Sequence, residues 1–280
     1  YKPDLLIFGH ADLIKDSTLS YLKDNYKNLK IAQWFLDPLI KNGPDFEKNK
    51  MRILDKIELT DANFITTSPD VLNFLPKKKP CFFMPNPSDS SFEVLNNYNN
   101  NQCSMDVFFA LSHGVHRGTL KRGKYDERAD FVNKLVEKTP NVKFDLYGIN
   151  NIQPIWADSF LKSIANAKMG VNLSRGSPIK YYSSDRITQL VGNGLLTFIH
   201  DNTYYNNFFD NDEIVFYNNI NSLSEKIQKF AKDDVQRKKI AKKGKDKYMK
   251  FFNSTIVADY IINNTFSIKY NKNKYLWEKK

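Results

Sequence analysis

Short apolar runs alternate with amphipathic stretches along most of this chain. Unbroken apolar runs of this length are typical of parallel strands covered on both faces, whereas apolar positions three and four residues apart predict helices. The runs predicted as strands are residues 4–9, 30–36, 62–67, 80–84, 105–111, 142–148, 169–174, 195–200 and 213–217. The stretches predicted as helices include residues 126–138, 158–167 and 222–250. This alternation predicts an α/β fold built on open, doubly wound sheets with right-handed crossovers.

One region, residues 85–104, interrupts this rhythm with two prolines, many Asn and Ser residues and little apolar periodicity. Such a composition indicates a linker. We therefore expect two Rossmann-like domains, residues 1–90 and 91–265, facing each other across a cleft, with a basic tail at 266–280. In folds of this kind the carboxyl ends of the strands open into the cleft, and ligands bind there. Because a strand follows almost directly on residue 1, we also expect the first domain to be truncated at its start.

Composition adds information on the core and on the charge of the partners. The 280 residues are 41% hydrophobic and 14% aromatic, which suits globular domains, and the formal net charge is +11. An excess of positive charge favours nucleotide phosphates, nucleic acid or a membrane surface as partners, although a solvated lysine-rich surface gives the same charge. The two cysteines, Cys81 and Cys103, exclude a disulfide framework and a cysteine-rich zinc site. No apolar run approaches the ~20 residues of a membrane span, so we expect a cytoplasmic protein.

A candidate anion site lies in the stretch KYYSSDRITQLVGNGLLTFIHD, residues 180–201, which predicts a polar loop, a short helix, a Gly-rich end and a buried strand. Asp185 can cap this helix, and Gly194 can end it in left-handed geometry. Arg186 then falls in the first turn, where a cation opposes the helix dipole and needs a compensating anion. That anion is either a carboxylate such as Asp185 or a phosphate held by Arg186 and the free N–H groups of the helix start.

The loop before this helix, SRGSPIKYYSSD, follows a predicted strand directly and therefore starts at its carboxyl end. A nucleotide needs cations or N–H groups for its diphosphate and an aromatic wall for its base. The loop offers both kinds of group, and the residues predicted to bind such a ligand are Arg175, Lys180, Tyr181 and Ser184.

A second basic loop, SHGVHRGTLKRGKYDER, follows the predicted strand at 105–111. Its glycines allow a ligand to approach the backbone closely, and Arg117 is its candidate phosphate ligand. A flexible solvated loop is the alternative. His113 and His116 are three residues apart, but no acidic or cysteine ligand accompanies them locally, so a metal site is disfavoured.

The order of these elements resembles the carboxyl-terminal half of GT-B glycosyltransferases, and in particular the CgeB-like, or spore-maturation-type, glycosyltransferases. SDRITQLVGNGLLTFIHD resembles the family's pattern of an Arg, an apolar residue, Glu-Ala, two variable positions, a small residue and Gly before a strand. In the first domain QWFLDP resembles the family's aromatic-rich strand ending in Asp and Pro, and FMPNPSD resembles its approach to the interdomain linker. The resemblance covers about residues 30–265.

This resemblance implies a hexosyltransferase-type glycosyltransferase that moves a sugar from a nucleotide-sugar donor to a glycan, lipid or protein acceptor. Arg186 and Gly194 match the family's Arg and Gly, whereas Gln189 stands where the family usually has a Glu that accepts hydrogen bonds from the ribose hydroxyls. Arg117 matches the family's basic loop only approximately. Arginine, lysine and helix N–H groups would hold the leaving diphosphate, so neither a metal nor a cofactor beyond the nucleotide-sugar co-substrate is expected.

Candidate catalytic residues come from the first domain. His10 and Asp12 follow a predicted strand in the sequence GHAD, so both would face the cleft. His10 could deprotonate an acceptor hydroxyl with Asp12 as its orienting partner, or the two could belong to a surface turn. Asp37, in the sequence FLDP, is the alternative base.

Other function classes also fit the sequence. A non-catalytic GT-B-like binding module would be consistent with Gln189 in place of Glu, and a nucleic-acid-binding protein with the charge, but no nucleic-acid module is recognisable and none is expected as a partner. The basic run 236–250 could contact anionic lipid at the inner face of the membrane, with a solvated helix as the default. Asp210 and Asp212 have the D-x-D spacing of a metal–nucleotide site, but they precede a strand, so we interpret them as part of a solvated turn.

Overall fold

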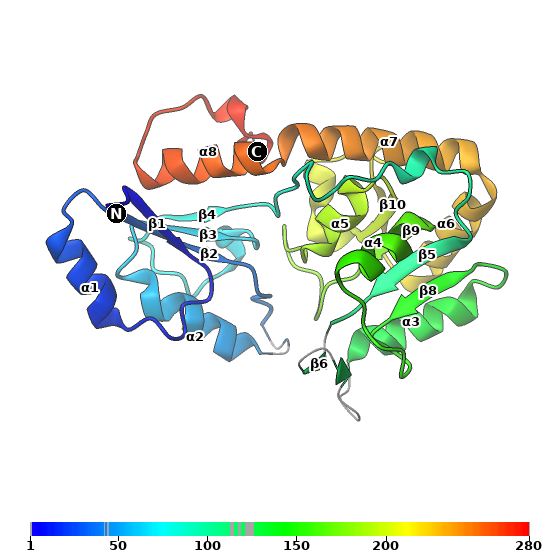
Figure 1. The fold of residues 1–280 in the computed structure, drawn as a ribbon, viewed down its shortest axis with the longest axis horizontal. Coiled ribbons are helices and arrows are strands. Elements are labelled where there is room, and N and C mark those ends of the chain that lie inside the picture. The colour runs from blue at the N-terminus through cyan, green and yellow to red at the C-terminus, as the bar shows by residue number, and fades with distance from the viewer. Residues whose placement is uncertain are drawn as a thin grey trace.

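The computed structural model describes residues 2–41, 43, 45–112 and 126–279, together with the backbone of 115–116 and 119–120. Within these residues the chain forms two parallel β-sheets with helices on their faces, and a short antiparallel pair, β6 and β7 (Figure 1). The strands are β1 (Leu5–Phe8), β2 (Lys30–Phe35), β3 (Ala62–Ile65), β4 (Cys81–Phe83), β5 (Met105–Ala110), β6 (Val115–His116), β7 (Thr119–Leu120), β8 (Phe144–Tyr147), β9 (Ala167–Asn172), β10 (Leu196–His200) and β11 (Val215–Tyr217). The helices are α1 (Asp16–Asn25), α2 (Phe46–Ile57), α3 (Glu127–Lys138), α4 (Ala157–Ala165), α5 (Arg186–Gly192), α6 (Ile220–Lys232), α7 (Asp234–Phe251) and α8 (Ser254–Thr265). Each run predicted as a strand contains or overlaps one of these strands, and the predicted α/β class is confirmed.

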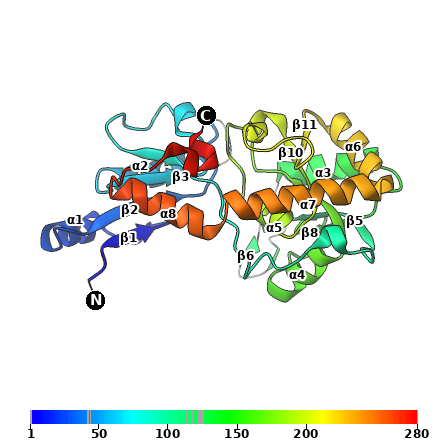
Figure 2. The same ribbon diagram turned by 90° about the horizontal axis from the view of Figure 1, so that it is seen from above.

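The first sheet has the strand order β1-β2-β3-β4, and all its strands are parallel. Right-handed crossovers between consecutive neighbours return on the same side, so α1 and α2 lie on one face (Figure 1). The opposite face is covered by α8, which comes from the far end of the chain and packs against β2 and β3 (Figure 2). The ring centroid of Tyr260 on α8 lies 6.0 Å from that of Phe64 on β3. The first domain is therefore completed by a helix that follows the second domain in sequence.

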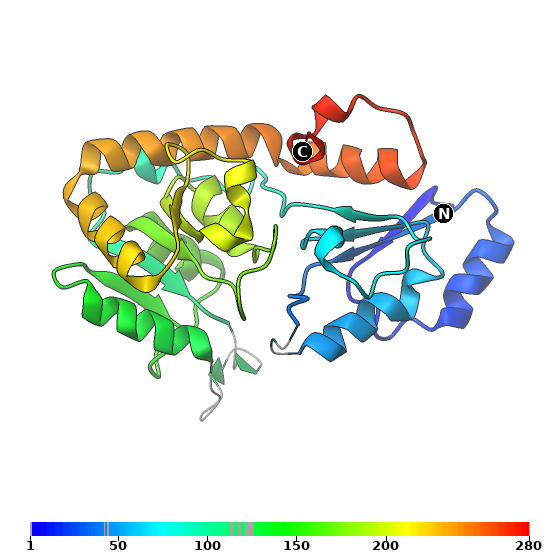
Figure 3. The same ribbon diagram turned by 180° about the vertical axis from the view of Figure 1, so that it is seen from behind.

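The second sheet has the order β11-β10-β9-β5-β8 and is also parallel. The helices α3 and α6 pack together on one face and α5 packs on β9 and β10 from the other, while α7 runs along the sheet and contacts both α5 and α6 (Figures 2 and 3). The strand β5 comes first in sequence and has β8 on one side and β9 on the other. The strand order therefore reverses at β5, and the crevice at the carboxyl ends of β5 and β9 is where ligands bind in such sheets.

The chain crosses between the two domains twice, and the two crossings are hydrogen-bonded to each other. The backbone N–H of Ser88 donates to the carbonyl of Phe252 at 2.9 Å, and the N–H of Ser254 donates to the carbonyl of Ser88 at 2.7 Å. Further along the linker the amide of the buried Asn97 donates to the carbonyls of Ile164 and Ala167. The segment predicted as a linker is therefore held against the second domain.

The end of the chain differs from the basic tail expected at 266–280. Tyr275 and Trp277 are buried there, and Trp277 lies 5.6 Å from Phe252 and 5.2 Å from Tyr260, centroid to centroid. The chain end accordingly lies beside the junction of α7 and α8 (Figures 1 and 3). Burial of these large aromatic rings is favourable enough to order the lysine-rich segment, which folds back against α8.

The single helix predicted over 222–250 is divided into α6 and α7. Asp233 stands between them and accepts a hydrogen bond from the N–H of Gln236, which caps the start of α7. Among the described residues, no helix has both the length and the apolar character needed to cross a bilayer.

Trp277→Ala is expected to destabilise the protein by about 3–5 kcal/mol, because it removes a buried ring that nearby rings cannot replace. Denaturant unfolding followed by fluorescence and circular dichroism measures this loss. Val235→Ala is the control, because Val235 on α7 is 82% exposed and should change the free energy of unfolding by less than about 0.5 kcal/mol. Equal, small effects of the two changes would contradict the structural role of the chain end.

Candidate functional site

The carboxyl ends of both sheets converge on a cavity of about 380 Å³ between the domains, which we call the cleft pocket. Loops after β1, β2, β5 and β9 line it, together with the first turns of α2 and α3. The first domain contributes, among others, His10, Asp37, Asp45, Lys48, Asn49 and Arg52. The second domain contributes Ser112, Arg128, Arg175, Tyr182, Ser184 and Arg186. The cleft expected between two facing Rossmann-like domains is therefore present.

Three residues of the first-domain wall, His10, Asp37 and Arg52, form a network that includes Asp12 outside the cleft pocket. The Nε2 atom of His10 lies 2.9 Å from Oδ2 of Asp37. Arg52 lies between the two acids, 3.4 Å from Asp37 and 2.6 Å from Asp12. Its hydrogen bond lowers the pKa of the Asp12 carboxyl. The acid in contact with His10 is therefore Asp37 rather than the predicted Asp12, which pairs with Arg52.

Arg186 occupies the switch point of the second sheet. Its guanidinium donates to the carbonyls of Ala110 and Leu173, which end β5 and β9, and to Oγ of Ser184. It also lies 5.0 Å from the ring centroid of Phe109. Burial, reinforced by the nearby charge of Arg128, lowers the pKa of Arg186 to about 10. The hydrogen bonds of Arg186 therefore go to strand ends rather than to Asp185, and its positive charge has no bonded carboxylate among these contacts.

Two more arginines surround the same space. Arg128 is buried and makes a bidentate pair with Asp126, at 2.9 and 2.7 Å. Arg175 reaches across the cleft to Asp45 of the first domain, 2.6 Å away, and its buried Nε has no hydrogen-bond partner in the described structure. Guanidinium groups match the geometry of phosphate oxygens, so their concentration around a small cavity suits a diphosphate.

A second cavity of about 310 Å³ adjoins the cleft pocket and shares Ser112 and Arg186 with it. We call it the side pocket. Its wall includes Trp156, whose side chain is 46% exposed, and Gln189. The sequence analysis did not predict Trp156 as a lining residue, whereas it placed Gln189 where the family's Glu contacts the ribose. Ala157, also in this wall, has a left-handed φ of 49°, a strained conformation of the kind that collects at ligand sites.

Two predicted donor ligands have other partners. Lys180 pairs with Asp70 of the first domain, which raises the pKa of Lys180. Tyr181 is buried, with its ring 4.9 Å from Phe83 and 4.6 Å from Phe208. Neither residue lines the cleft pocket or the side pocket. Lys180, which was predicted to bind the diphosphate, forms an interdomain contact, and Tyr181, which was predicted as a wall for the base, is part of the core.

The neighbour Tyr182 lines the cleft pocket instead, and burial, with the charge of Asp37 nearby, raises the pKa of its hydroxyl. Gly194 lies outside both pockets. Its φ of 77° ends α5, and a Cβ there would come within 2.7 Å of Tyr98, so its role is structural. Arg117 and His113 lie outside the described residues, as does the side chain of His116.

Sequence reasoning missed several lining residues because no local pattern marks them. Trp156 is hidden by its place just before a helix, and Arg128 reads as an ordinary charge in the first turn of α3. The D-x-D pair precedes β11, where Asp212 pairs with Lys243 and the adjacent Glu213 with Lys247. Those acids lie outside both pockets, as their position before a strand predicted.

Two parallel-sheet domains whose carboxyl ends enclose an arginine-rich cleft define an architecture shared with GT-B glycosyltransferases. Residues 126–263 match the family described as glycosyl transferase-like. No sequence among the curated proteins matches the chain.

Solved structures extend the likeness to the first domain. TarM is 17% identical with a TM-score of 0.64, and the match covers 93% of this chain and 54% of TarM. Sucrose-phosphate synthase from Thermosynechococcus elongatus is 10% identical with a TM-score of 0.64, covering 96% of this chain and 75% of that one. Anabaena HepE, solved in complex with UDP-glucose, is 10% identical with a TM-score of 0.63, covering 95% and 79%.

The chain spans about half the length of TarM, at 54%. Identities this low establish the GT-B fold rather than a shared substrate. Together, these structures establish the GT-B fold for the chain, and the family match relates residues 126–263 to glycosyl transferase-like proteins.

Asp45→Asn is expected to raise the affinity for pyrophosphate several-fold, because it frees Arg175 from a competing carboxylate while Asn tolerates the left-handed φ of 59° at this position. Calorimetry at two salt concentrations measures the change, and the gain should shrink at high salt. Glu47→Gln is the matched control, since Glu47 lies in the first turn of the helix that follows Asp45, is 71% exposed and pairs with Lys50. A gain of equal size in the control would show a general charge effect instead.

Proposed function

We propose that this protein is a metal-independent glycosyltransferase of the hexosyltransferase type, in the CgeB-like group, which uses a nucleotide-sugar donor. One observation carries the proposal. The arginine cluster at the switch point has a nucleoside-sized side pocket on one flank and the His10–Asp37 pair on the other. A nucleotide-sugar donor bound here would have its base in the side pocket, its diphosphate at the arginine cluster and its reacting carbon near the His10–Asp37 pair.

In this arrangement the nucleoside occupies the side pocket. The indole of Trp156 offers a face for stacking of the base, and the side-chain amide of Gln189 can both donate to and accept from a ribose hydroxyl. The diphosphate then lies against Arg186, where the pockets meet. The complex of HepE with UDP-glucose makes a uridine nucleotide the first donor to test.

The leaving nucleoside diphosphate gains negative charge as the glycosidic bond to it breaks. Arg128, Arg175 and Arg186 line that position before the reaction starts, so their positive charge can stabilise the leaving group. A divalent cation would be redundant in this electrostatic environment. We therefore propose that neither a metal nor a further cofactor takes part, and donor turnover should persist in excess EDTA.

His10 serves as the general base. In this mechanism the proton of the neutral imidazole lies on Nε2, 2.9 Å from Asp37, which leaves the lone pair of Nδ1 to take the proton of an acceptor hydroxyl. Asp37 fixes this tautomer and stabilises the imidazolium that forms. The acceptor approaches from the first domain, since His10 belongs to the loop after β1.

A non-catalytic nucleotide-binding module is the second candidate, because Gln189 lacks the charge of the Glu usual in the family. Hydrolysis of a UDP-sugar distinguishes the two, since a module binds UDP without turning over the donor.

Membrane contact through α7 is less favoured, because Lys238, Lys242 and Lys243 already form ion pairs with acids of this chain.

Gln189→Ala is expected to weaken UDP binding about 2–12-fold, the worth of one net hydrogen bond, and to leave pyrophosphate binding unchanged. Trp156→Ala should show the same selectivity for the nucleoside. Calorimetric titrations with both ligands measure the difference. Equal losses for UDP and pyrophosphate would place the nucleoside elsewhere.

His10→Ala is expected to slow hydrolysis of a UDP-sugar by about 10²–10⁴-fold, with the Kd for UDP unchanged. The sugar nucleotide is the one turned over fastest among UDP-glucose, UDP-galactose and UDP-N-acetylglucosamine. Asp37→Asn should lose most of the same activity, whereas Asp12→Asn should keep it within a few-fold. The opposite order of the two Asp variants would restore Asp12 as the orienting acid.

A further inference from the structure

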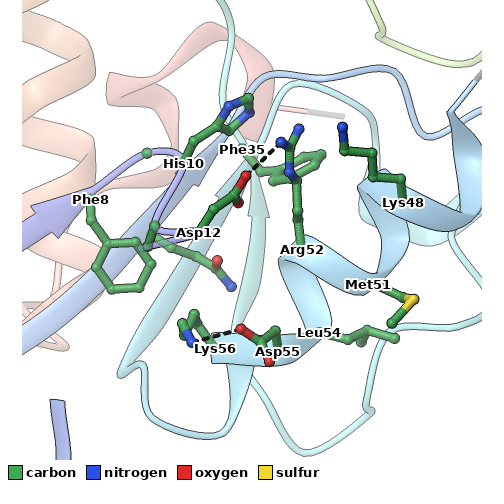
Figure 4. Close-up of a pocket in the computed structure, with 13 residues that line it drawn as sticks. Phe8, His10, Asp12, Phe35, Lys48, Met51, Arg52, Leu54, Asp55 and Lys56 are labelled. Carbon is green, nitrogen blue, oxygen red and sulfur yellow. Dashed lines mark hydrogen bonds and ion pairs between the residues drawn. The ribbon is translucent and has the colours of Figure 1, made fainter. Parts of the chain in front are cut away.

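A cavity of about 800 Å³ lies wholly within the first domain (Figure 4). It opens between the loop after β1 and the helix α2, and its floor is formed by Gln33 in the middle of β2. It shares His10, Lys48 and Arg52 with the cleft pocket. The two cavities are therefore continuous at the proposed base, and we call the larger one the acceptor groove.

The walls of the acceptor groove are largely apolar. Phe8 and Phe35 come from the last positions of β1 and β2, and Met51 and Leu54 project from α2 (Figure 4). Met51 is 68% exposed, which is unusual for so large an apolar side chain beside a cavity. Flexible Met side chains adapt to apolar ligands of varied shape. The groove therefore offers an apolar surface that ends at the histidine.

Two cations of the groove, Arg52 and Lys56, are already paired within the protein. Arg52 contacts Asp12 and Asp37, as described above, and Figure 4 shows it facing Asp12. Lys56, at the other end, contacts Asp55 at 2.6 Å and also Asp16.

Lys48 is the one cation of this lining with no ion pair among the described residues, and it stands where the groove meets the cleft pocket. A phosphate deep in the groove would have to compete with these carboxylates for Arg52 and Lys56, and this competition costs affinity. A neutral ligand avoids that cost.

We propose that the acceptor groove takes a neutral alcohol carried on an apolar body, such as an alkyl or aryl glycoside. This inference rests on the proposed function and names the acceptor class for it. The apolar body lies along Phe8, Phe35 and Met51, and the hydroxyl reaches His10. The hydroxyl oxygen bonds to the anomeric carbon of the donor sugar while the bond from that carbon to the diphosphate oxygen breaks. The hydroxyl proton passes to Nδ1 of His10, and the electron pair leaves with the nucleoside diphosphate.

The test compares three acceptors below their micelle concentrations, namely n-octyl β-D-glucoside, methyl β-D-glucoside and n-octyl phosphate. Binding to the protein with UDP bound is followed by saturation-transfer NMR, and transfer from the chosen UDP-sugar by UDP release and mass spectrometry of the product. Octyl glucoside should bind and react with a KM at least about 10-fold below that of methyl glucoside, as expected when several CH₂ groups are buried. Octyl phosphate should neither bind in the groove nor compete with octyl glucoside.

Met51→Gln should raise the KM for octyl glucoside several-fold while the KM for methyl glucoside and the Kd for UDP stay the same. Val235→Gln, an exposed apolar-to-polar change on α7, is the matched control and should alter none of these values. Equal KM values for the two glucosides, or tighter binding of octyl phosphate, would overturn the inference while UDP binding and donor hydrolysis upheld the proposed function. Loss of UDP binding and hydrolysis in the unaltered protein would instead refute the proposed function itself.

Discussion

The guanidinium of Arg186 joins the carboxyl ends of β5 and β9, and the geometry of the cleft depends on this contact. Two parallel strands that diverge at a switch point leave carbonyl groups without partners. Arg186 satisfies those of Ala110 and Leu173 from one rigid, planar group, and it brings a full positive charge to the same place. Arg186 is partly buried and has no hydrogen-bonded carboxylate among the described residues, so an anion that reaches it can form a charge-assisted hydrogen bond. Arg186 therefore both joins the two strand ends and provides a positive charge that an anionic ligand can bind.

The width of the cleft is controlled on both sides of this centre. Behind it, the hydrogen-bonded crossings at Ser88 and Phe252 and the ring of Trp277 connect the two domains. In front of it, Arg175 and Lys180 form ion pairs with acids of the first domain. The rear contacts are buried and aromatic, whereas the front ones are partly exposed and sensitive to salt and to competing anions. Ligand binding can therefore change the front contacts without disturbing the rear ones.

Charge is distributed differently in the cleft pocket and in the acceptor groove. Arginines of the second domain are concentrated at the cleft pocket, while the acids and bases that line the acceptor groove compensate one another. This division suits the proposed glycosyl transfer, in which one partner brings a diphosphate and the other only a hydroxyl. The net charge of +11 does not indicate where this positive charge is concentrated, because many surface lysines are paired or solvated.

The sequence by itself determined the order of the strands in the two parallel sheets, the linker, the cleft and the place of Arg186, because these follow from periodicity and from the position of a loop after a strand. Gln189 was found in the same way. Tertiary structure alone decided which groups pair. Lys180 meets Asp70 across 110 residues of sequence, Arg175 meets Asp45 across 130, and Tyr181 turns into the core while Tyr182 faces the cleft. These pairings depend on contacts between segments that are distant in sequence, and the direction of Tyr181 depends on its left-handed φ of 62°. Neither feature produces a periodic pattern in the sequence.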